Sequence, residues 1–324
     1  MSNWTLCGDP HAANDNLEKI GKLFDKFEEL GNPVIILGDL FDTKEVISGK
    51  TLNFVFDRIK RSLLKFVILT GNHDWFNRDC LDHSLQIFKA LPNVTVVDEV
   101  TNIGSFAVAA PYFDDVKALK KQLPRAKEAA GKLLFMHQGV AGFDYGNGKI
   151  ATGKEHGEAA ADAFRHFKLV ISGHFHKFAK DGKLVFLGTP FSHTFGEADQ
   201  EKVLGILNDE TFELTYVPTN LPQHWDVRWD ISNGDRLFEL DKIVDEFNHW
   251  RVFLSGTEAQ IGAFPKERYE RAKFIDDPID VAQIDDSNIR DTDSNEEKFV
   301  TWATEIKKLP DSTILEGLEI LKSA

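Results

Sequence analysis

Five short apolar runs, each followed directly by side chains that can bind metal ions, constrain the fold of this chain most strongly. The runs are Thr5–Cys7, Val34–Leu37, Phe66–Thr70, Leu133–Met136 and Leu169–Ser172. A glycine follows four of them, as expected where the backbone turns sharply close to a bound group. The polar residues that come next are Asp9 and His11, Asp39, Asn72 and His73, His137, and His174 and His176. If the runs are strands of one layered domain, their ends can bring these side chains to a single point.

The rest of the chain alternates apolar runs with segments of helical period, which is typical of an α/β or α+β layered domain. Leu17–Leu30 has apolar residues on one helical face, with Asn14 or Asp15 as its predicted cap and Gly31 as its stop. A second helix is predicted over Leu52–Leu64. Further strands are predicted over Thr95–Val97, Phe106–Ala109, Leu184–Leu187, Val203–Leu207 and Phe212–Val217.

Length and composition set broad limits. A chain of 324 residues can bury a full core and still form a second, smaller unit. No run approaches the roughly 20 apolar residues that a membrane span needs, and Met1–Leu6 lacks the basic and apolar segments of an export signal. Cys7 and Cys80 match neither a zinc knuckle nor a redox pair. We therefore expect a cytoplasmic protein without a membrane partner.

The chain is acidic: its net charge is −14, of which −10 lies in residues 226–324. Such a protein does not attract a polyanion through its own long-range field. A nucleic-acid substrate would have to be held by metal ions, by a local basic patch or by a partner. Lys149 and Lys154 could form such a patch, although an ordinary turn is the simpler interpretation of the loop Tyr145–Lys149.

The polar residues after the five runs favour metal chemistry as a set. A single histidine at a strand end is more often a satisfied polar residue than a ligand, and Gly-Asp is common in ordinary turns. Together, the carboxylates, imidazoles and one amide form a ligand set of oxygen and nitrogen atoms without thiolates. Such a set fits Mn²⁺ best, with Fe, Zn or Co as alternatives. Two cations that share a carboxylate can activate water and stabilise the charge of a phosphoryl group.

The motifs Asp-x-His, Gly-Asp-x-x-Asp, Gly-Asn-His-Asp, a lone His and Gly-His-x-His together resemble the signature of the calcineurin-like metallophosphoesterases. The resemblance implies a β-sandwich flanked by helices and two divalent metal ions, for which we expect Mn²⁺. Gly38–Thr43, Leu187–Pro190 and Phe195–Glu197 with Lys202 are similar to the SbcD-type DNA nuclease subunits. Within that family, the recombination endonuclease subunits of T-even-like bacteriophages share this length and an acidic C-terminal part, and a viral source would place the protein in the host cytoplasm.

The same resemblance implies roles for individual residues. One metal ion would be held by Asp9, His11, Asp39 and His176, and the other by Asp39, Asn72, His137 and His174. Asp39 would bridge the two ions. His73 would be the catalytic acid, with Asp74 orienting its ring; the plainer alternative is that His73 only packs beneath the ions. Asp42 receives no role, because in some relatives this position is a histidine. The histidines outside the motifs, interpreted as structural or exposed, are His83, His156, His166, His193, His224 and His249.

Four segments are predicted along the chain. Residues 1–222 would form the metallophosphoesterase domain and 223–275 a small α/β capping domain. The acidic stretch 276–297 is predicted to be a solvated linker. Residues 298–324 form two amphipathic helical stripes, which either dock a partner or pack back onto the chain. The resemblance favours docking onto the coiled-coil base of an SMC-like ATPase of the SbcC type. Within the capping domain, the predicted strands are Trp225–Ile231 and Trp250–Leu254, and the predicted helix is Leu237–Phe247.

Three classes of function follow from these observations. The first is a DNA nuclease subunit, an exonuclease or endonuclease in recombination and repair that works as a homodimer with the ATPase. The second is a stand-alone phosphodiesterase or phosphatase for small molecules or phosphoproteins; only the downstream motifs and the C-terminal extension argue against it. The third is a non-catalytic scaffold, which an intact ligand set disfavours. We expect the first.

Overall fold

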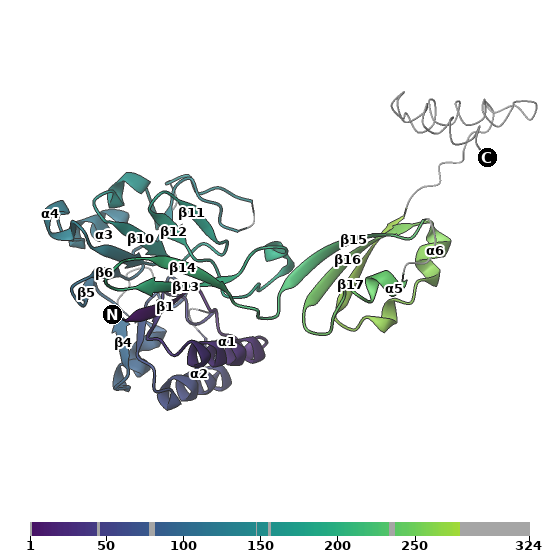
Figure 1. Cartoon of the computed structure of the whole chain (residues 1–324), viewed down its shortest axis with the longest axis horizontal. Helices are drawn as coiled ribbons and strands as arrows, with labels where there is room; N and C mark the ends of the chain where they lie inside the picture. Colours follow the sequence, from purple (N-terminus) through teal and green to yellow (C-terminus); the bar gives the residue numbers. More distant parts are fainter. Residues whose placement is uncertain are drawn as a thin grey trace, which may run out of the picture. The chain divides into compact units, whose positions relative to one another are not determined.

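The computed structural model describes residues 2–43, 46–77, 82–146, 148–154, 157–232 and 237–278, and Figure 1 follows the chain through them. Contacts within the chain divide it into two compact units. The first unit consists of the chain up to residue 227 together with residues 244–251 and 270–272. The described residues of the second unit lie within 228–243, 252–269 and 273–278. The predicted C-terminal helices, residues 298–324, lie outside the described residues.

The first unit contains a six-stranded sheet with the order β14-β13-β1-β2-β3-β4. The four strands at one end, which run parallel, are β1 (Asn3–Cys7), β2 (Val34–Ile36), β3 (Phe66–Leu69) and β4 (Val94–Val97). β13 (Val203–Asn208) and β14 (Leu214–Pro218) extend the sheet in antiparallel fashion beside β1. The carboxyl ends of β1, β2 and β3 therefore lie at the same edge of the sheet.

A second six-stranded sheet has the order β11-β12-β10-β7-β6-β5. Its four central strands, which run parallel, are β12 (Leu184–Phe186), β10 (Leu169–Ser172), β7 (Leu133–Met136) and β6 (Ala107–Ala110). β11 (Ala179–Asp181) and β5 (Thr101–Ile103) pair in antiparallel fashion at the two edges. The carboxyl ends of β7 and β10 thus also share one edge.

The two sheets pack face to face through one apolar layer. Ile35 and Leu69 from the first sheet belong to the same buried cluster as Phe135 and Ile171 from the second. Alternate residues of the same strands point to the opposite, outer faces, because successive side chains of a strand face opposite sides. Helices cover those outer faces. The predicted β-sandwich flanked by helices is therefore confirmed.

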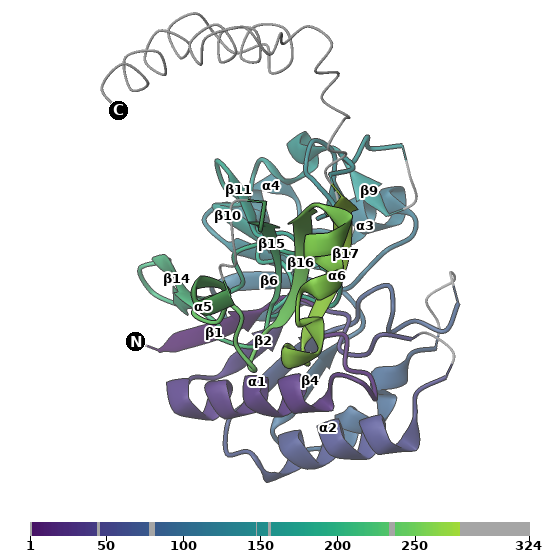
Figure 2. The ribbon, with the colours of Figure 1, turned by 90° about the vertical axis from the view of Figure 1, so that its right-hand side faces the viewer.

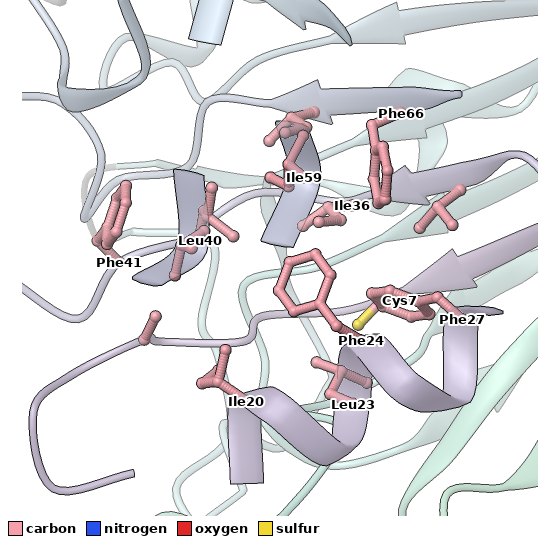
Figure 3. Close-up of a cluster of buried hydrophobic side chains, with 14 of the residues drawn as sticks. Cys7, Ile20, Leu23, Phe24, Phe27, Ile36, Leu40, Phe41, Ile59 and Phe66 are labelled. Carbon is pink, nitrogen blue, oxygen red and sulfur yellow. The ribbon is translucent and has the colours of Figure 1, made fainter. Parts of the chain in front are cut away.

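The outer face of the first sheet is covered by α1 (Leu17–Leu30) and α2 (Gly49–Arg61), which lie side by side along the sheet (Figure 2). Their apolar faces pack against strand residues such as Ile36 and Phe66 (Figure 3). α3 (Val116–Gln122), α4 (Ala126–Ala129) and the 3-10 helix η2 (Ala161–Phe164) cover the second sheet. Each large apolar side chain buried in this way contributes about 1.5–3 kcal/mol, so both outer layers hold the strands, and their ends, in place.

The cap of α1 and the start of α2 differ from their predictions. α1 has the predicted extent and ends at Gly31, whose φ of 66° is left-handed. Its N-cap is Asn16, however, so the prediction of Asn14 or Asp15 as the cap was wrong. α2 begins about one turn earlier than predicted, because the side chain of Ser48 accepts a hydrogen bond from the backbone and caps the helix there.

The second unit contains most of a three-stranded sheet with the order β15-β16-β17. The strands are β15 (His224–Asp230), β16 (His249–Gly256) and β17 (Ala272–Pro278). The predicted helix over Leu237–Phe247 was wrong in length, because α5 spans only Leu237–Leu240. α6 (Glu258–Ala263), which begins with a capping box, and β17 were not predicted. Since β17 continues to Pro278, the first residues of the predicted linker belong to a strand.

The remaining elements are short. A two-stranded sheet pairs β8 (Gly139–Val140) with β9 (Glu158–Ala159). Three further 3-10 helices are η1 (Ser84–Ala90), η3 (Phe195–Glu197) and η4 (Lys266–Arg268). Within the described ranges, no helix combines the length and the apolar character that crossing a bilayer requires.

Candidate metal centre

The residues predicted to bind metal ions follow five strand ends in the two facing sheets. The pairs of strand and side chains are β1 with Asp9 and His11, β2 with Asp39, β3 with Asn72, β7 with His137, and β10 with His174 and His176. Hydrogen-bonding contacts and ion pairs connect residues of both sheets within this set. The structure therefore brings all the predicted ligands together.

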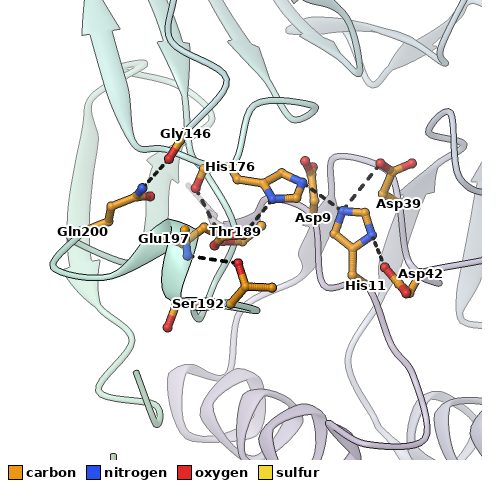
Figure 4. Close-up of polar contacts among 12 residues, drawn as sticks. Asp9, His11, Asp39, Asp42, Gly146, His176, Thr189, Ser192, Glu197 and Gln200 are labelled. Carbon is orange, nitrogen blue, oxygen red and sulfur yellow. Dashed lines mark hydrogen bonds and ion pairs between the residues drawn. The ribbon is translucent and has the colours of Figure 1, made fainter. Parts of the chain in front are cut away.

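One group of ligand atoms comes from Asp9, His11 and His176, whose atoms lie within 4.8 Å of one another. The Nε2 atoms of His11 and His176 face each other at 3.2 Å (Figure 4). Oδ2 of Asp39 lies 3.7 Å from Nε2 of His11 and completes the predicted set. The geometry suits one cation with mixed oxygen and nitrogen ligands.

A second group lies beside the first and shares Asp39 with it. Oδ1 of Asn72 is 3.0 Å from Nε2 of His137 and 2.7 Å from Nδ1 of His174. Nε2 of His137 is also 3.3 Å from Oδ2 of Asp39. Asp39 is thus positioned between the two groups, as a bridging ligand would be.

The ligand atoms fit cations because the protein leaves buried polar atoms of the cluster without hydrogen-bond partners. Asp9, Asp39 and His137 are almost completely buried. Among the described residues, Oδ1 of Asp9 and Nδ1 of His11 are buried without a hydrogen-bond partner. Buried carboxylate oxygens without partners are costly, and a cation removes that cost.

The pKa values in the cluster reflect burial and charge crowding. Burial raises the pKa of Asp9 to about 7 and lowers that of His174 to about 3. Burial alone would also lower the pKa of His137, but the neighbouring Asp39 and Asp9 raise it to about 9. Burial by itself would raise the pKa of the Asp39 carboxyl. The neighbouring His137 and His11 outweigh burial and hold this pKa well below its usual range. The central carboxylate therefore stays ionised, as a bridging ligand must.

The backbone is held in an unusual conformation at three of these residues. His11, Asp39 and His174 have φ values of 46°, 48° and 84°. Residues other than glycine rarely adopt left-handed φ values, and such strain collects at functional sites. The sharp turns after β1, β2 and β10 thus direct these side chains into the cluster.

Gly71, in the turn after β3, permits the close approach of Asp39. A Cβ atom at this position would collide with the carboxylate and the backbone nitrogen of Asp39. We expect Gly71→Ala to fold but to lose about 10²-fold in phosphoester hydrolysis, because displacements of about 1 Å can cost this much. The matched control is Gly49→Ala at the start of α2, where a Cβ would meet nothing within 4 Å. Steady-state rates of both variants test the expectation, and equal rates would contradict it.

His73 lies at the edge of the cluster, and its surroundings correct one prediction. Its ring is 4.8 Å from that of His11, and its Nδ1 is 2.5 Å from the backbone oxygen of Asp42. The prediction that Asp74 orients this ring was wrong. The buried Asp74 carboxylate instead accepts a hydrogen bond from the backbone N–H of Gly71, at 2.8 Å, because the turn after β3 directs it inward.

His73 and Asp42 also lie closer to the ligands than expected. Ligand atoms of His73, His11 and Asp39 lie within 4.8 Å of one another, so His73 is within reach of the cluster. Oδ1 of Asp42 is 3.5 Å from Nδ1 of His11. The Asp42 position, which received no role from the sequence, therefore contacts two histidines of the site.

Several neighbours of the site received no role from the sequence. Nδ1 of His137 is 2.7 Å from the backbone oxygen of Leu37, and Nδ1 of His176 is 2.9 Å from Oε1 of Glu197. His193, interpreted as structural or exposed, packs its ring 5.2 Å from that of His11. The only signal was the position of Glu197 and His193 in the stretch after the last histidine pair.

The loop before β9 contacts the site through its backbone. His176 donates its backbone N–H to the oxygen of Tyr145, at 3.1 Å. The ammonium of Lys149 lies over the Tyr145 ring, 5.2 Å from its centroid. The basic patch of Lys149 and Lys154 remains a prediction.

Comparison with known proteins agrees with this geometry. Residues 4–178 match the family model of the calcineurin-like phosphoesterases, and the matched part contains all five strand ends. The chain belongs to the calcineurin-like phosphoesterases. This metal-dependent phosphoesterase is also similar to exonuclease subunit 1 of Enterobacteria phage T4, with 24% identity over 288 residues that cover 85% of this chain and 80% of that protein. The predicted resemblance to the family, and to a T-even phage subunit, is confirmed.

Proposed function

We propose that this phosphoesterase is a DNA nuclease subunit that hydrolyses phosphodiesters as an exonuclease or endonuclease in recombination or repair. The observation that carries the proposal is a centre of two ligand groups sharing Asp39, in a chain similar along 85% of its length to a protein named exonuclease subunit 1. Two ligand groups suit the displacement at a phosphodiester, in which charge develops on both the attacking and the leaving oxygen.

Two divalent ions, Mn²⁺ in our proposal, would be held by the predicted ligands. Asp9, His11, Asp39 and His176 would hold one ion, and Asp39, Asn72, His137 and His174 the other. When bound, such ions supply an activated water and neutralise charge on the phosphate. The oxygen and nitrogen ligands, without thiolate, support the choice of Mn²⁺.

His73 would provide the proton for the leaving oxygen. The backbone oxygen of Asp42 can only accept a hydrogen bond, so Nδ1 of His73 carries a proton and Nε2 is left for transfer. The step starts from the doubly protonated ring: as the phosphorus–oxygen bond breaks, its electron pair stays on the leaving oxygen, which takes the second proton from Nε2 and leaves the neutral ring with its proton on Nδ1. Water then reprotonates the ring. The contact with Asp42 keeps the ring in one orientation during these steps.

Assembly with a partner is part of the proposal. The similar phage protein is named as a subunit, which supports a complex. We propose that the chain forms a homodimer, that residues 223–275 present DNA, and that residues 298–324 dock an SMC-like coiled-coil ATPase. Such an ATPase would supply DNA binding that a chain of net charge −14 lacks. Light scattering of the purified chain tests the dimer, and a monomer at micromolar concentration would contradict it.

The first experiment is hydrolysis of linear double-stranded DNA beside bis-p-nitrophenyl phosphate, with Mn²⁺ and with EDTA. We expect the chain to cleave both substrates with Mn²⁺ and neither with EDTA, because the centre needs its cations. The Asp39→Ala variant should cleave neither. Cleavage of the small ester alone would favour a stand-alone phosphodiesterase unless an added ATPase partner restored DNA cleavage, and cleavage of neither would favour the scaffold.

A further inference from the structure

The ring of His176 is held on the side away from the ligand cluster by Glu197. His176 follows β10, and Glu197 ends the 3-10 helix η3; Nδ1 of the ring is 2.9 Å from Oε1 of the carboxylate. Nε2 of the same ring points to His11 in the cluster, at 3.2 Å. An acceptor at Nδ1 selects the tautomer whose Nε2 lone pair is free for a metal ion, and it fixes the direction of that lone pair.

Glu197 is in turn held by Lys202, whose side chain is only 1% exposed. The Lys202 ammonium donates to Oε2 of Glu197 at 2.8 Å, to Oγ1 of Thr189 at 2.7 Å and to the backbone oxygen of His176 at 3.0 Å. A lysine has three N–H donors, and these three contacts are shorter than the fourth, to Oε1 of Gln200 at 3.4 Å. Figure 4 shows Glu197 and Thr189 beneath the His176 ring.

The contacts close into a small network around one ligand. The Thr189 hydroxyl donates to Oε2 of Glu197 at 2.9 Å, and the Thr189 backbone N–H donates to the oxygen of His176 at 3.1 Å. Lys202 therefore contacts the carboxylate that holds the ring and also the backbone that carries it. Both the ring and the main chain of His176 depend on this network.

The two predicted ion sites differ in how their histidines are held. Nδ1 of His137, in the other site, faces the neutral backbone oxygen of Leu37 at 2.7 Å. His176 instead faces a carboxylate, and a carboxylate makes an imidazole a more basic ligand than a carbonyl does. Glu197 and Lys202 lie after residue 178, where the match to the family model ends.

A buried lysine–glutamate pair alone would not indicate a role in metal binding, because the cost of desolvating both charges offsets much of their attraction. Here, however, Oε1 of Glu197 contacts His176, a predicted metal ligand, rather than solvent. We propose that Glu197 and Lys202 are positioning residues for His176, so that the ion site of Asp9, His11 and His176 depends on this pair while the other ion site does not. The inference rests on the proposed two-metal centre.

The test measures Mn²⁺ binding rather than hydrolysis alone. In calorimetric titrations of the full chain, Glu197→Gln should lower the affinity for one of two Mn²⁺ ions about 10–100-fold and leave the affinity for the other unchanged. Loss of a partner behind a ligating histidine has an effect of this size. Electron paramagnetic resonance should show the signal of an isolated Mn²⁺ ion replacing that of a coupled pair. Because Gln leaves a buried lysine unpaired, the double variant Glu197→Leu with Lys202→Leu, which removes both charges, is measured as well.

A second histidine–carboxylate–lysine arrangement in the same unit provides the control. Nε2 of His83 is 3.1 Å from Oδ2 of Asp98, which is 2.5 Å from the ammonium of Lys89. Asp98→Asn removes a comparable carboxylate away from the ligand atoms and should leave both Mn²⁺ ions bound.

The outcomes separate this inference from the proposed function. If the unaltered chain bound no Mn²⁺, the two-metal proposal itself would fail. If the unaltered chain and both Glu197 variants each bound two ions with equal affinity, only the positioning role would be overturned. Unfolding of both Glu197 variants, with a folded Asp98→Asn, would also overturn it, because the pair would then serve packing.

Discussion

Asp39→Asn is expected to lower phosphoester hydrolysis by about 10³-fold or more while the chain still folds. Oδ2 of Asp39 lies between His11 and His137, and Oδ1 accepts a hydrogen bond from the backbone N–H of His73 at 2.7 Å. Losing a single group that stabilises developing charge costs about 10²–10³ in kcat, and Asp39 serves both ligand groups. Asn keeps the size of the side chain, and it tolerates the left-handed φ of 48° at this position.

The measurements are kcat on bis-p-nitrophenyl phosphate and Mn²⁺ stoichiometry, beside circular dichroism to verify folding. Asp57→Asn on α2 is the matched control, because this exposed aspartate pairs with Arg61 at the surface, at 3.3 Å, away from the ligand atoms. The control should keep both its rate and its metal content. An Asp39→Asn variant that bound two ions and turned over normally would exclude Asp39 as the bridging ligand.

His73→Gln is expected to lower kcat on DNA by about 10²–10⁴-fold with little change in KM or in Mn²⁺ content. General-acid transfer matters most when the leaving group is a poor one, such as the alkoxide of a deoxyribose. The p-nitrophenolate of the small ester leaves without a proton, so the same variant should lose much less activity on bis-p-nitrophenyl phosphate. The ratio of the two losses is therefore the informative quantity.

His166→Gln is the control for this substitution, since His166 packs against Phe167 and lies in no group of ligand atoms that the described residues form. Equal losses on both substrates for His73→Gln would argue that His73 binds the phosphate rather than protonating the leaving oxygen. Loss of bound Mn²⁺ would indicate instead that His73 is a ligand, which its distance from His11 and Asp39 allows.

The layered fold and the ligand residues could both be predicted from local patterns. An apolar run followed by a carboxylate or imidazole, in most cases after a glycine, identifies a strand end, and parallel strands place such ends at one edge. Asp9, Asp39 and His137 could therefore be named without any knowledge of distances. Helix ends were less predictable: α1 has Asn16 as its cap rather than Asn14 or Asp15, and the side chain of Asn14 instead accepts a hydrogen bond from Thr51 of α2.

The partners that hold the ligands depended on the tertiary structure alone. Leu37 lies 100 residues from His137, and its contribution is a backbone oxygen, which no side-chain pattern can signal. His73 shows the same limit, since adjacency suggested Asp74 and folding instead supplied the carbonyl of Asp42. By itself the sequence predicted which residues come together and which strand ends carry them, because ligand chemistry and apolar periodicity are local properties. The direction of each ring was decided only by the packing of the two sheets, because that direction depends on atoms from segments far apart in the chain.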